Sequence, residues 1–237
     1  MSKIIHTIQS SDKVEFDEKV NQFLESGGEL MDNGYQVINN DDGVIYSQVI
    51  VFNKNCDVEF YVNGQLKCVK NKNEDGETDG LWTDWYDNGQ KKEERNYKDG
   101  KYDGLWKEWY ENGQKKLEWN FKDGKPDGLH ITWYPDGQKR YEVDHKDGKK
   151  DGPFTNWFNN GIKKQNGIYK DDSFHGLCTT WYYNGQKEQV GVFKDGKPDG
   201  KFTNWYENGL KSGEVIIKND IIVEVIGRWN EDGSVKE

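Results

Sequence analysis

The chain has 237 residues, of which 32% are hydrophobic and 14% aromatic, and its formal net charge is −10 at pH 7. Ten tryptophans exclude an intrinsically disordered chain, because disordered segments are poor in aromatic residues. The acidic balance excludes the basic surface of a nucleic-acid binder and makes an anionic membrane an unfavourable partner.

The distribution of charge and cysteine narrows the class of protein further. Residues 1–78 carry 7 basic and 14 acidic side chains, whereas residues 79–237 carry 26 and 29. Cys56, Cys68 and Cys178 form no CxxC pair, and an odd number does not build a disulfide framework. The N-terminus has no apolar signal-peptide core, and no run approaches the ~18 apolar residues of a membrane helix. We therefore expect a cytoplasmic protein.

The first 54 residues have the signals of a small α+β domain. Residues 3–9 alternate in polarity as a short strand does. Residues 12–24 combine a capping-box start with apolar residues at helical spacing, which predicts an amphipathic helix. Strands are expected over residues 35–38 and 44–52, on either side of a polar turn. Residues 1–54 are thus predicted to form a β-α-β-β head domain.

Two segments of this head resemble a small uncharacterised bacterial domain family. Residues 27–30 (GGEL) are similar to its GWEL-like turn, and residues 46–51 (YSQVIV) are similar to its final YAQAxV-like strand. Gly28 stands where the family has a tryptophan. The resemblance implies no known activity, and we interpret the head as a folded cap or adaptor.

A pattern of 24 residues recurs through the rest of the chain without slippage. Its fixed points are two glycines and one tryptophan per unit: Gly80, Gly104, Gly128, Gly152, Gly176 and Gly200; Gly89, Gly113, Gly137, Gly161, Gly185 and Gly209; Trp85, Trp109, Trp133, Trp157, Trp181 and Trp205. Such self-similarity predicts a repeat architecture. The array should span residues 55–237, with a degenerate first unit (55–78), six full units (79–222) and a truncated last unit (223–237).

Each unit has the signals of two strands and two tight turns. Asn88–Gly89 is a strong hairpin signal, because both central turn positions tolerate positive φ, and Asp99–Gly100 supplies a second such turn. We therefore predict a mainly β fold, an elongated antiparallel β-meander of stacked 24-residue hairpins. Aromatic residues point to both faces of each predicted strand, so we expect the sheet to twist into a groove or a flattened roll.

The repeat resembles the bacterial variant of the MORN repeat found in YwqK-type antitoxin proteins. Residues 104–116 (GLWKEWYENGQKK) fit its pattern G-x-x-x-x-W/Y-Y-x-x-N-G-x-x-K/R position by position. The resemblance covers about three quarters of the chain. It implies a stacked β-hairpin array that serves as a scaffold, and an antitoxin role in some members.

Positions that vary between units are the predicted binding residues. The constant tryptophan and the tyrosine after it should serve packing, which every unit needs. Two varying rows face a partner in our hypothesis, and from them we select Trp82, Trp106, His130, Phe154, Phe202, Arg95 and Trp119. Drift without selection would produce the same variation, so this alternative stays open.

Charged and metal-like patterns have simpler interpretations. Two lysine rows, which include Lys91 and Lys98, are expected to be solvated turn residues that discourage sheet aggregation, although a stripe for phosphates or an acidic protein is the alternative. Residues 123–128 and 195–200 lack the alternating ligands of a calcium loop. The four histidines have no ligand spacing, and no catalytic motif is present. We predict no metal, no cofactor and no enzymatic activity.

The leading functional hypothesis is a non-catalytic protein-binding scaffold, with an antitoxin or immunity protein as one specific form. A carbohydrate-binding or cell-wall-binding array is an alternative, because residues 181–185 (WYYNG) look like choline-binding hairpins. Membrane-surface binding and an enzymatic head are weaker alternatives. The end strands of an open array could also pair between two copies, which gives a homodimer.

Overall fold

The computed structural model describes residues 5–10, 29–40, 43–51, 56–62 and 65–236. The chain divides into two compact units, Met1–Gly104 and Leu105–Glu237. Each unit is described by itself. In the described residues, no helix is long and apolar enough to cross a membrane.

The first unit begins with a three-stranded antiparallel sheet. Its strands are β1 (Ile5–Ser10), β2 (Glu29–Asn40) and β3 (Gly43–Val51), in the order β1-β3-β2. All three predicted strands are confirmed, but β2 begins six residues before the expected start at Tyr35. The added segment contains Asp, Asn and Gly, which have low strand propensity, and a register shift between Leu30 and Tyr35 accommodates it. The predicted helix over residues 12–24 lies outside the described residues.

The repeats of the first unit form consecutive antiparallel pairs. Each strand pairs with the next one along the chain. The strands are β4 (Cys56–Phe60), β5 (Leu66–Lys72), β6 (Thr78–Trp85), β7 (Lys91–Lys98) and β8 (Lys101–Tyr102). A further strand, β9 (Gly104–Trp109), begins at the division between the units.

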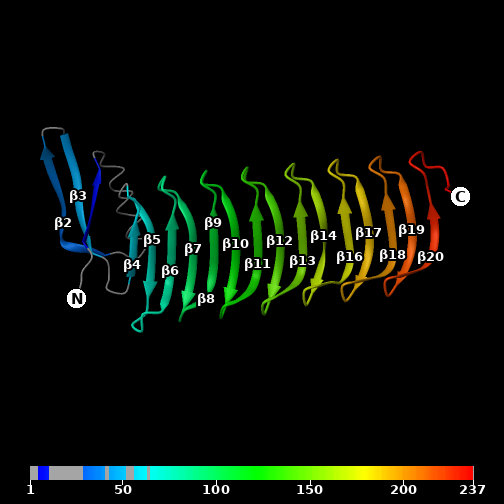
Figure 1. Cartoon of the computed structure of the whole chain (residues 1–237), viewed down its shortest axis with the longest axis horizontal. Helices are drawn as coiled ribbons and strands as arrows, with labels where there is room; N and C mark the ends of the chain where they lie inside the picture. Colours follow the sequence, from blue (N-terminus) through cyan, green and yellow to red (C-terminus); the bar gives the residue numbers. More distant parts are fainter. Residues whose placement is uncertain (1–4, 11–28, 41–42, 52–55, 63–64, 237) are drawn as a thin grey trace. The chain divides into compact units, whose positions relative to one another are not determined.

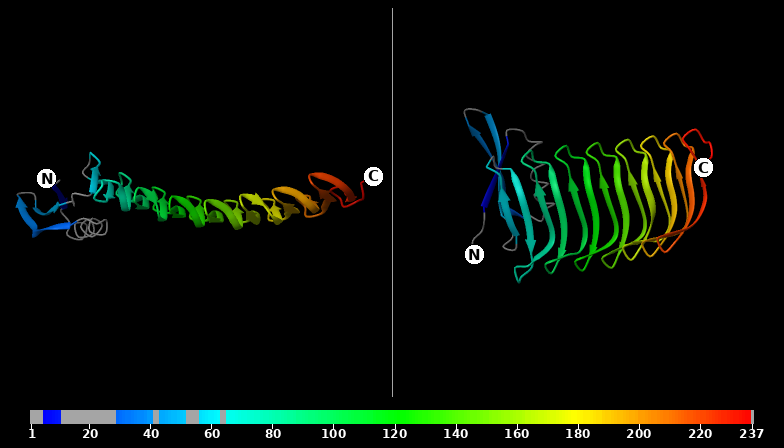
Figure 2. Two further views of the ribbon diagram at one scale, coloured as in Figure 1. Left: turned by 90° about the horizontal axis from the view of Figure 1, so that it is seen from below. Right: turned by 45° about the vertical axis from the view of Figure 1, so that its right-hand side comes forward.

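The second unit is a continuous antiparallel meander, as predicted (Figure 1). Its strands curve in the same sense, and the sheet is an open, bent layer rather than a closed roll (Figure 2). Neighbouring strands in the chain pair with each other, and β14 pairs with both β15 and β16. The strands are β10 (Lys115–Lys122), β11 (Lys125–Trp133), β12 (Lys139–Lys146), β13 (Lys149–Trp157), β14 (Lys163–Lys170), β15 (Ser173–Phe174), β16 (Gly176–Trp181), β17 (Lys187–Lys194), β18 (Lys197–Trp205), β19 (Lys211–Lys218) and β20 (Ile221–Arg228).

The two predicted turns differ in geometry. At Asp99–Gly100 both residues have positive φ, 47° and 73°, as a two-residue hairpin turn requires. At Asn88–Gly89 the hairpin is confirmed, but only Gly89 has positive φ, at 83°. Here the loop is longer, and the Asn88 side-chain oxygen accepts a hydrogen bond from the Gln90 amide at 3.0 Å. The expectation of two positive φ values was wrong because a register shift beside Trp85 gives the chain room for a wider turn.

Side-chain hydrogen bonds join each turn to the next repeat. The tyrosine hydroxyl donates to the tryptophan carbonyl 23 residues on, at 2.8–2.9 Å, for Tyr110–Trp133, Tyr134–Trp157, Tyr182–Trp205 and Tyr206–Trp229. The turn asparagine donates to a carbonyl of the next turn, at 2.7–3.0 Å, for Asn112–Pro135, Asn160–Tyr183, Asn184–Glu207 and Asn208–Glu231. We call these two rows the turn ladder. They explain why the tyrosine and the asparagine recur.

The asparagine amide has two roles in this ladder. Its oxygen accepts the amide hydrogen of the residue two positions on, as in Asn184 to Gln186 at 2.9 Å, and its nitrogen donates to the next repeat. An aspartate can perform only the first role, because an ionised carboxylate has no hydrogen to donate. The hairpin signal in the sequence is therefore also an inter-repeat contact.

Removing one hydroxyl from the ladder should lower stability. Tyr182→Phe deletes the bond to the Trp205 carbonyl, and we expect the free energy of unfolding to fall by about 1 kcal/mol. The repeat already contains the natural counterpart, Phe158. Phe158→Tyr should therefore raise the urea midpoint by supplying a hydroxyl toward Trp181. Equal midpoints for Tyr182→Phe and the parent protein would contradict the role of the ladder.

Candidate binding surfaces

Aromatic rings line one face of the sheet in the second unit. Cross-strand pairing of His130 with Val143, and of Val143 with Phe154, places these side chains on the same face. Ring centroids are 4.4 Å apart for Trp119–His130 and 5.3 Å apart for Phe193–Phe202. We call this set the aromatic face; it comprises Trp106, Trp119, Phe121, His130, Tyr141, His145, Phe154, Tyr169, Phe174, Phe193 and Phe202.

The predicted binding residues lie largely in this packed face. Phe154 and Phe202 are 2% and 3% exposed, so these two are core residues and not the surface residues we expected. Trp106, Trp119 and His130 are half-buried in the second unit, as are Trp82 and Arg95 in the first. A binding role for the seven residues stays a prediction.

The variation at these positions has a packing explanation. The two varying rows are cross-strand partners, and a large residue in one row faces a small one in the other. Gly191 pairs with Phe202, and a Cβ at Gly191 would come within 2.0 Å of the Phe202 ring. Gly167 pairs with Phe154 in the same way, with a Cβ contact at 2.9 Å. Compensation of volume between neighbouring strands therefore produces the variation without any partner.

The charged member of the predicted set is already occupied. Arg95 forms an ion pair with Glu93, and its guanidinium carbon lies 5.0 Å from the centroid of the Trp82 ring. Lys70 approaches the same ring at 4.3 Å. Cation–π contacts of this kind hold the side chains in place. In the first unit Trp82 and Arg95 thus act together in packing.

Two histidines of the aromatic face are buried beside Trp119. The centroids of His130 and His145 are 5.8 Å apart, and Nε2 of His130 and Nδ1 of His145 have no hydrogen-bond partner. Burial, followed by the charges of His145 and Lys150, lowers the pKa of His130 to about 4. Burial and Lys150 also lower the pKa of His145. Both rings are therefore neutral near pH 7 and pack as aromatic side chains.

Reactive groups are not gathered into a site in the part of the chain that the structure describes. No cluster of three or more His, Cys, Asp or Glu residues there could hold a metal ion. Burial, together with the nearby Asp84, raises the pKa of Cys68 to about 12, and burial raises the pKa of Cys178. These thiols are protonated at neutral pH and are poor nucleophiles.

The lysine row after each hairpin turn is paired with glutamates. Lys91 contacts Glu94 at 2.7 Å, and Lys115 contacts Glu118 at 2.6 Å, three residues on in each case. Lys115 also lies 5.7 Å from the centroid of the Trp133 ring in the next repeat. Lys139 and Lys211 repeat both contacts. This arrangement favours the structural interpretation of the row over a free phosphate-binding stripe.

The last strand, β20, exposes an apolar surface. Ile221, Ile222, Val223, Val225 and Ile226 are 66%, 53%, 55%, 48% and 46% exposed. In Figure 1 the strand lies at the end of the second unit's sheet. Terminal repeats of a stack usually present a polar outer face, so this end is exceptional.

A comparison with β18, one period earlier, shows how β20 differs from an internal strand. Ile221, Val223 and Val225 stand where β18 has Lys197, Asp199 and Lys201. Ile226 stands where Phe202 is 3% exposed. The signal was therefore present in the sequence as three lost charges in one strand, and our sequence analysis missed it.

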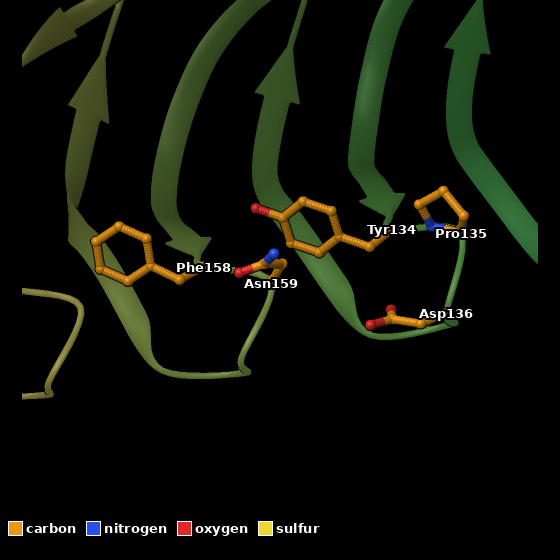
Figure 3. A pocket seen from close by; sticks show the side chains of 5 residues that line it. All are labelled: Tyr134, Pro135, Asp136, Phe158 and Asn159. Atoms are coloured by element: carbon orange, nitrogen blue, oxygen red, sulfur yellow. The ribbon is translucent and has the colours of Figure 1, made fainter.

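A shallow pocket of about 420 Å³ opens between two turns of the second unit. Tyr134, Pro135, Asp136, Phe158 and Asn159 line it (Figure 3). Two of these residues depart from the turn ladder: Asp136 replaces the asparagine, and Phe158 replaces the tyrosine. The pocket therefore coincides with an irregular part of the ladder.

The fold defines a β-hairpin repeat protein, and comparison with known families agrees. The model of the MORN repeat variant matches residues 78–99, 102–123, 126–147 and 174–195. Each match covers one hairpin and its following strand, so the chain carries repeats of the MORN type. No curated protein matches the chain.

Acid should destabilise the protein through the buried histidines. Their pKa values are lowered in the folded state, so stability is fully present above pH 6.5 and falls as the pH drops toward about 4. His130→Phe with His145→Phe restores aromatic residues found at the same repeat positions. We expect this double variant to show a smaller loss of thermal midpoint between pH 7 and pH 4. His175→Gln, which changes a histidine outside the aromatic face, should follow the parent protein.

Proposed function

We propose that the protein is a non-catalytic scaffold that binds another protein through β20. The observation that carries this proposal is the exposure of five Ile and Val side chains on one terminal strand. Contiguous exposed apolar patches mark interaction sites on soluble proteins. The MORN-type repeats support the same function, because such repeats generally serve as binding modules for proteins or membranes.

The apolar patch can supply a useful part of a binding energy. Complete burial of an Ile or Val side chain contributes roughly 1.5–3 kcal/mol, and those of β20 are about half exposed. Five of them therefore offer several kcal/mol. Association costs at least ~4 kcal/mol, so a partner must add polar contacts around the patch.

The charges near β20 define the chemistry of the partner. Glu224 lies on the strand, and Glu231 and Asp232 follow it in an exposed turn. The whole chain has a net charge of −10, which disfavours a second copy and favours a basic protein. The expected partner has an apolar patch with lysine or arginine at its rim.

The backbone of β20 limits how the partner can bind. Its pairing with β19 has two register irregularities, between Glu214 and Val215 and between Ile216 and Ile217. Irregularities of this kind interrupt the row of amide and carbonyl groups that an added strand would need. The partner is therefore expected to pack on the side chains rather than extend the sheet. A toxin that is covered by this surface would be one specific partner, which the antitoxin resemblance supports.

The test uses one charged substitution and a matched control. Val225→Asp places a charge in the patch, whereas Val62→Asp changes another exposed valine, in the first unit. The tagged parent protein is used to capture its partner from native cells, and the captured protein is then purified and titrated. We expect Val225→Asp to raise the Kd at least tenfold, since an unpaired charge must be desolvated, and Val62→Asp to leave it unchanged.

Two results would contradict the proposal. One is an equal Kd for the parent protein and Val225→Asp, with both proteins folded by circular dichroism. The other is a stoichiometric dimer of the pure parent protein in sedimentation velocity that Val225→Asp dissociates, because β20 would then be covered by a second copy.

A further inference from the structure

The turn pocket lies where the turn ladder lacks a hydrogen-bond donor. At the regular turns, the asparagine amide donates to a carbonyl 23 residues on, as Asn112 does to Pro135 at 2.8 Å. At the next turn the residue is Asp136, and the carbonyl 23 residues on belongs to Asn159. A carboxylate cannot supply the missing hydrogen. The repeat register therefore directs two oxygen acceptors toward the same gap.

The hydrogen bonds of Asp136 do not close this gap. The Gln138 amide donates to one carboxylate oxygen at 3.0 Å, and the Gln138 side chain approaches the other at 3.4 Å. Both contacts lie within the same turn. In the described residues, no side chain from this turn reaches the Asn159 carbonyl.

Aromatic rings form the rest of the pocket lining. The rings of Tyr134 and Phe158 lie in a row along the turns, with Asn159 between them (Figure 3). Arg140 lies 5.9 Å from the Tyr134 ring centroid, and Lys164 lies 5.7 Å from that of Phe158. These contacts show that cations of the chain already approach both rings.

We propose that this pocket binds the ammonium or guanidinium group of a lysine or arginine side chain from another molecule. Such a group supplies the hydrogens that Asp136 and Asn159 lack, and its charge is complementary to the carboxylate. Charge-assisted hydrogen bonds are the stronger kind, and adjacent aromatic rings favour a cation further. The volume of about 420 Å³ has room for the end of one side chain.

The site rests on different residues from the proposed docking of a protein on β20. Both use the expectation of a basic partner, but the pocket is defined by the Asp136 turn and can be tested with small molecules. Failure of one proposal is therefore distinguishable from failure of the other. Val225→Asp should leave cation binding at the pocket unchanged.

The experiment is an NMR titration of the full-length protein with three probes. Nα-acetyl-lysinamide and Nα-acetyl-argininamide carry the two cations, and Nα-acetyl-norleucinamide is the neutral control. We expect saturable shifts of the Asp136 and Asn159 amides with at least one cationic probe, and none with norleucinamide. The stronger of the two cationic probes identifies the side chain that the pocket prefers.

Asp136→Asn is the decisive variant because it restores the regular ladder. Its amide can donate to the Asn159 carbonyl as the other turns do, so the variant should fold and should have a raised thermal midpoint. We expect its affinity for the cationic probe to fall about tenfold or more, since a charge-assisted bond is lost. Arg140→Gln should strengthen binding by removing a like charge. Unchanged affinity in Asp136→Asn, or equal shifts with norleucinamide, would overturn the proposal.

Discussion

The structure depends on the contact between each hairpin and the next one. Only 32% of the residues are hydrophobic, and an open sheet has no second layer to bury them. The turn ladder supplies part of the cohesion, through bonds such as Tyr206 to the Trp229 carbonyl at 2.8 Å. The aromatic face supplies the rest. Stability in such an array is a sum over neighbouring repeats, so each repeat must preserve both contacts.

This dependence explains which residues are constant and which vary. The tyrosine and asparagine of the turn recur because each bonds to the following repeat. Residues of the aromatic face vary in compensating pairs, as Phe202 and Gly191 do across β17 and β18. Departures from the pattern then carry functional information. Two such departures, the apolar strand β20 and the Asp136 turn, are the surfaces that we propose for binding.

The sequence predicted the strands and turns well, because they follow from local signals. The 24-residue period and the Asp99–Gly100 turn required only neighbouring residues. The geometry at Asn88–Gly89 was missed because it depends on a register shift with the opposite strand. The burial of Phe154 was also missed, since alternation along a strand does not show which face is packed. The pocket at Asp136 depends on a partner 23 residues away, which no local pattern indicates.

Hydrogen exchange of the turn amides tests the turn ladder most directly. The turns at residues 110–114, 134–138, 158–162 and 182–186 have the same backbone bonds, but those at 134–138 and 158–162 each lack one side-chain bond to the next repeat. Our account predicts faster exchange in these two turns than in the other two, measured by mass spectrometry at one pH and temperature. Equal exchange in all four turns would contradict it, because the side-chain bonds would then add no local stability.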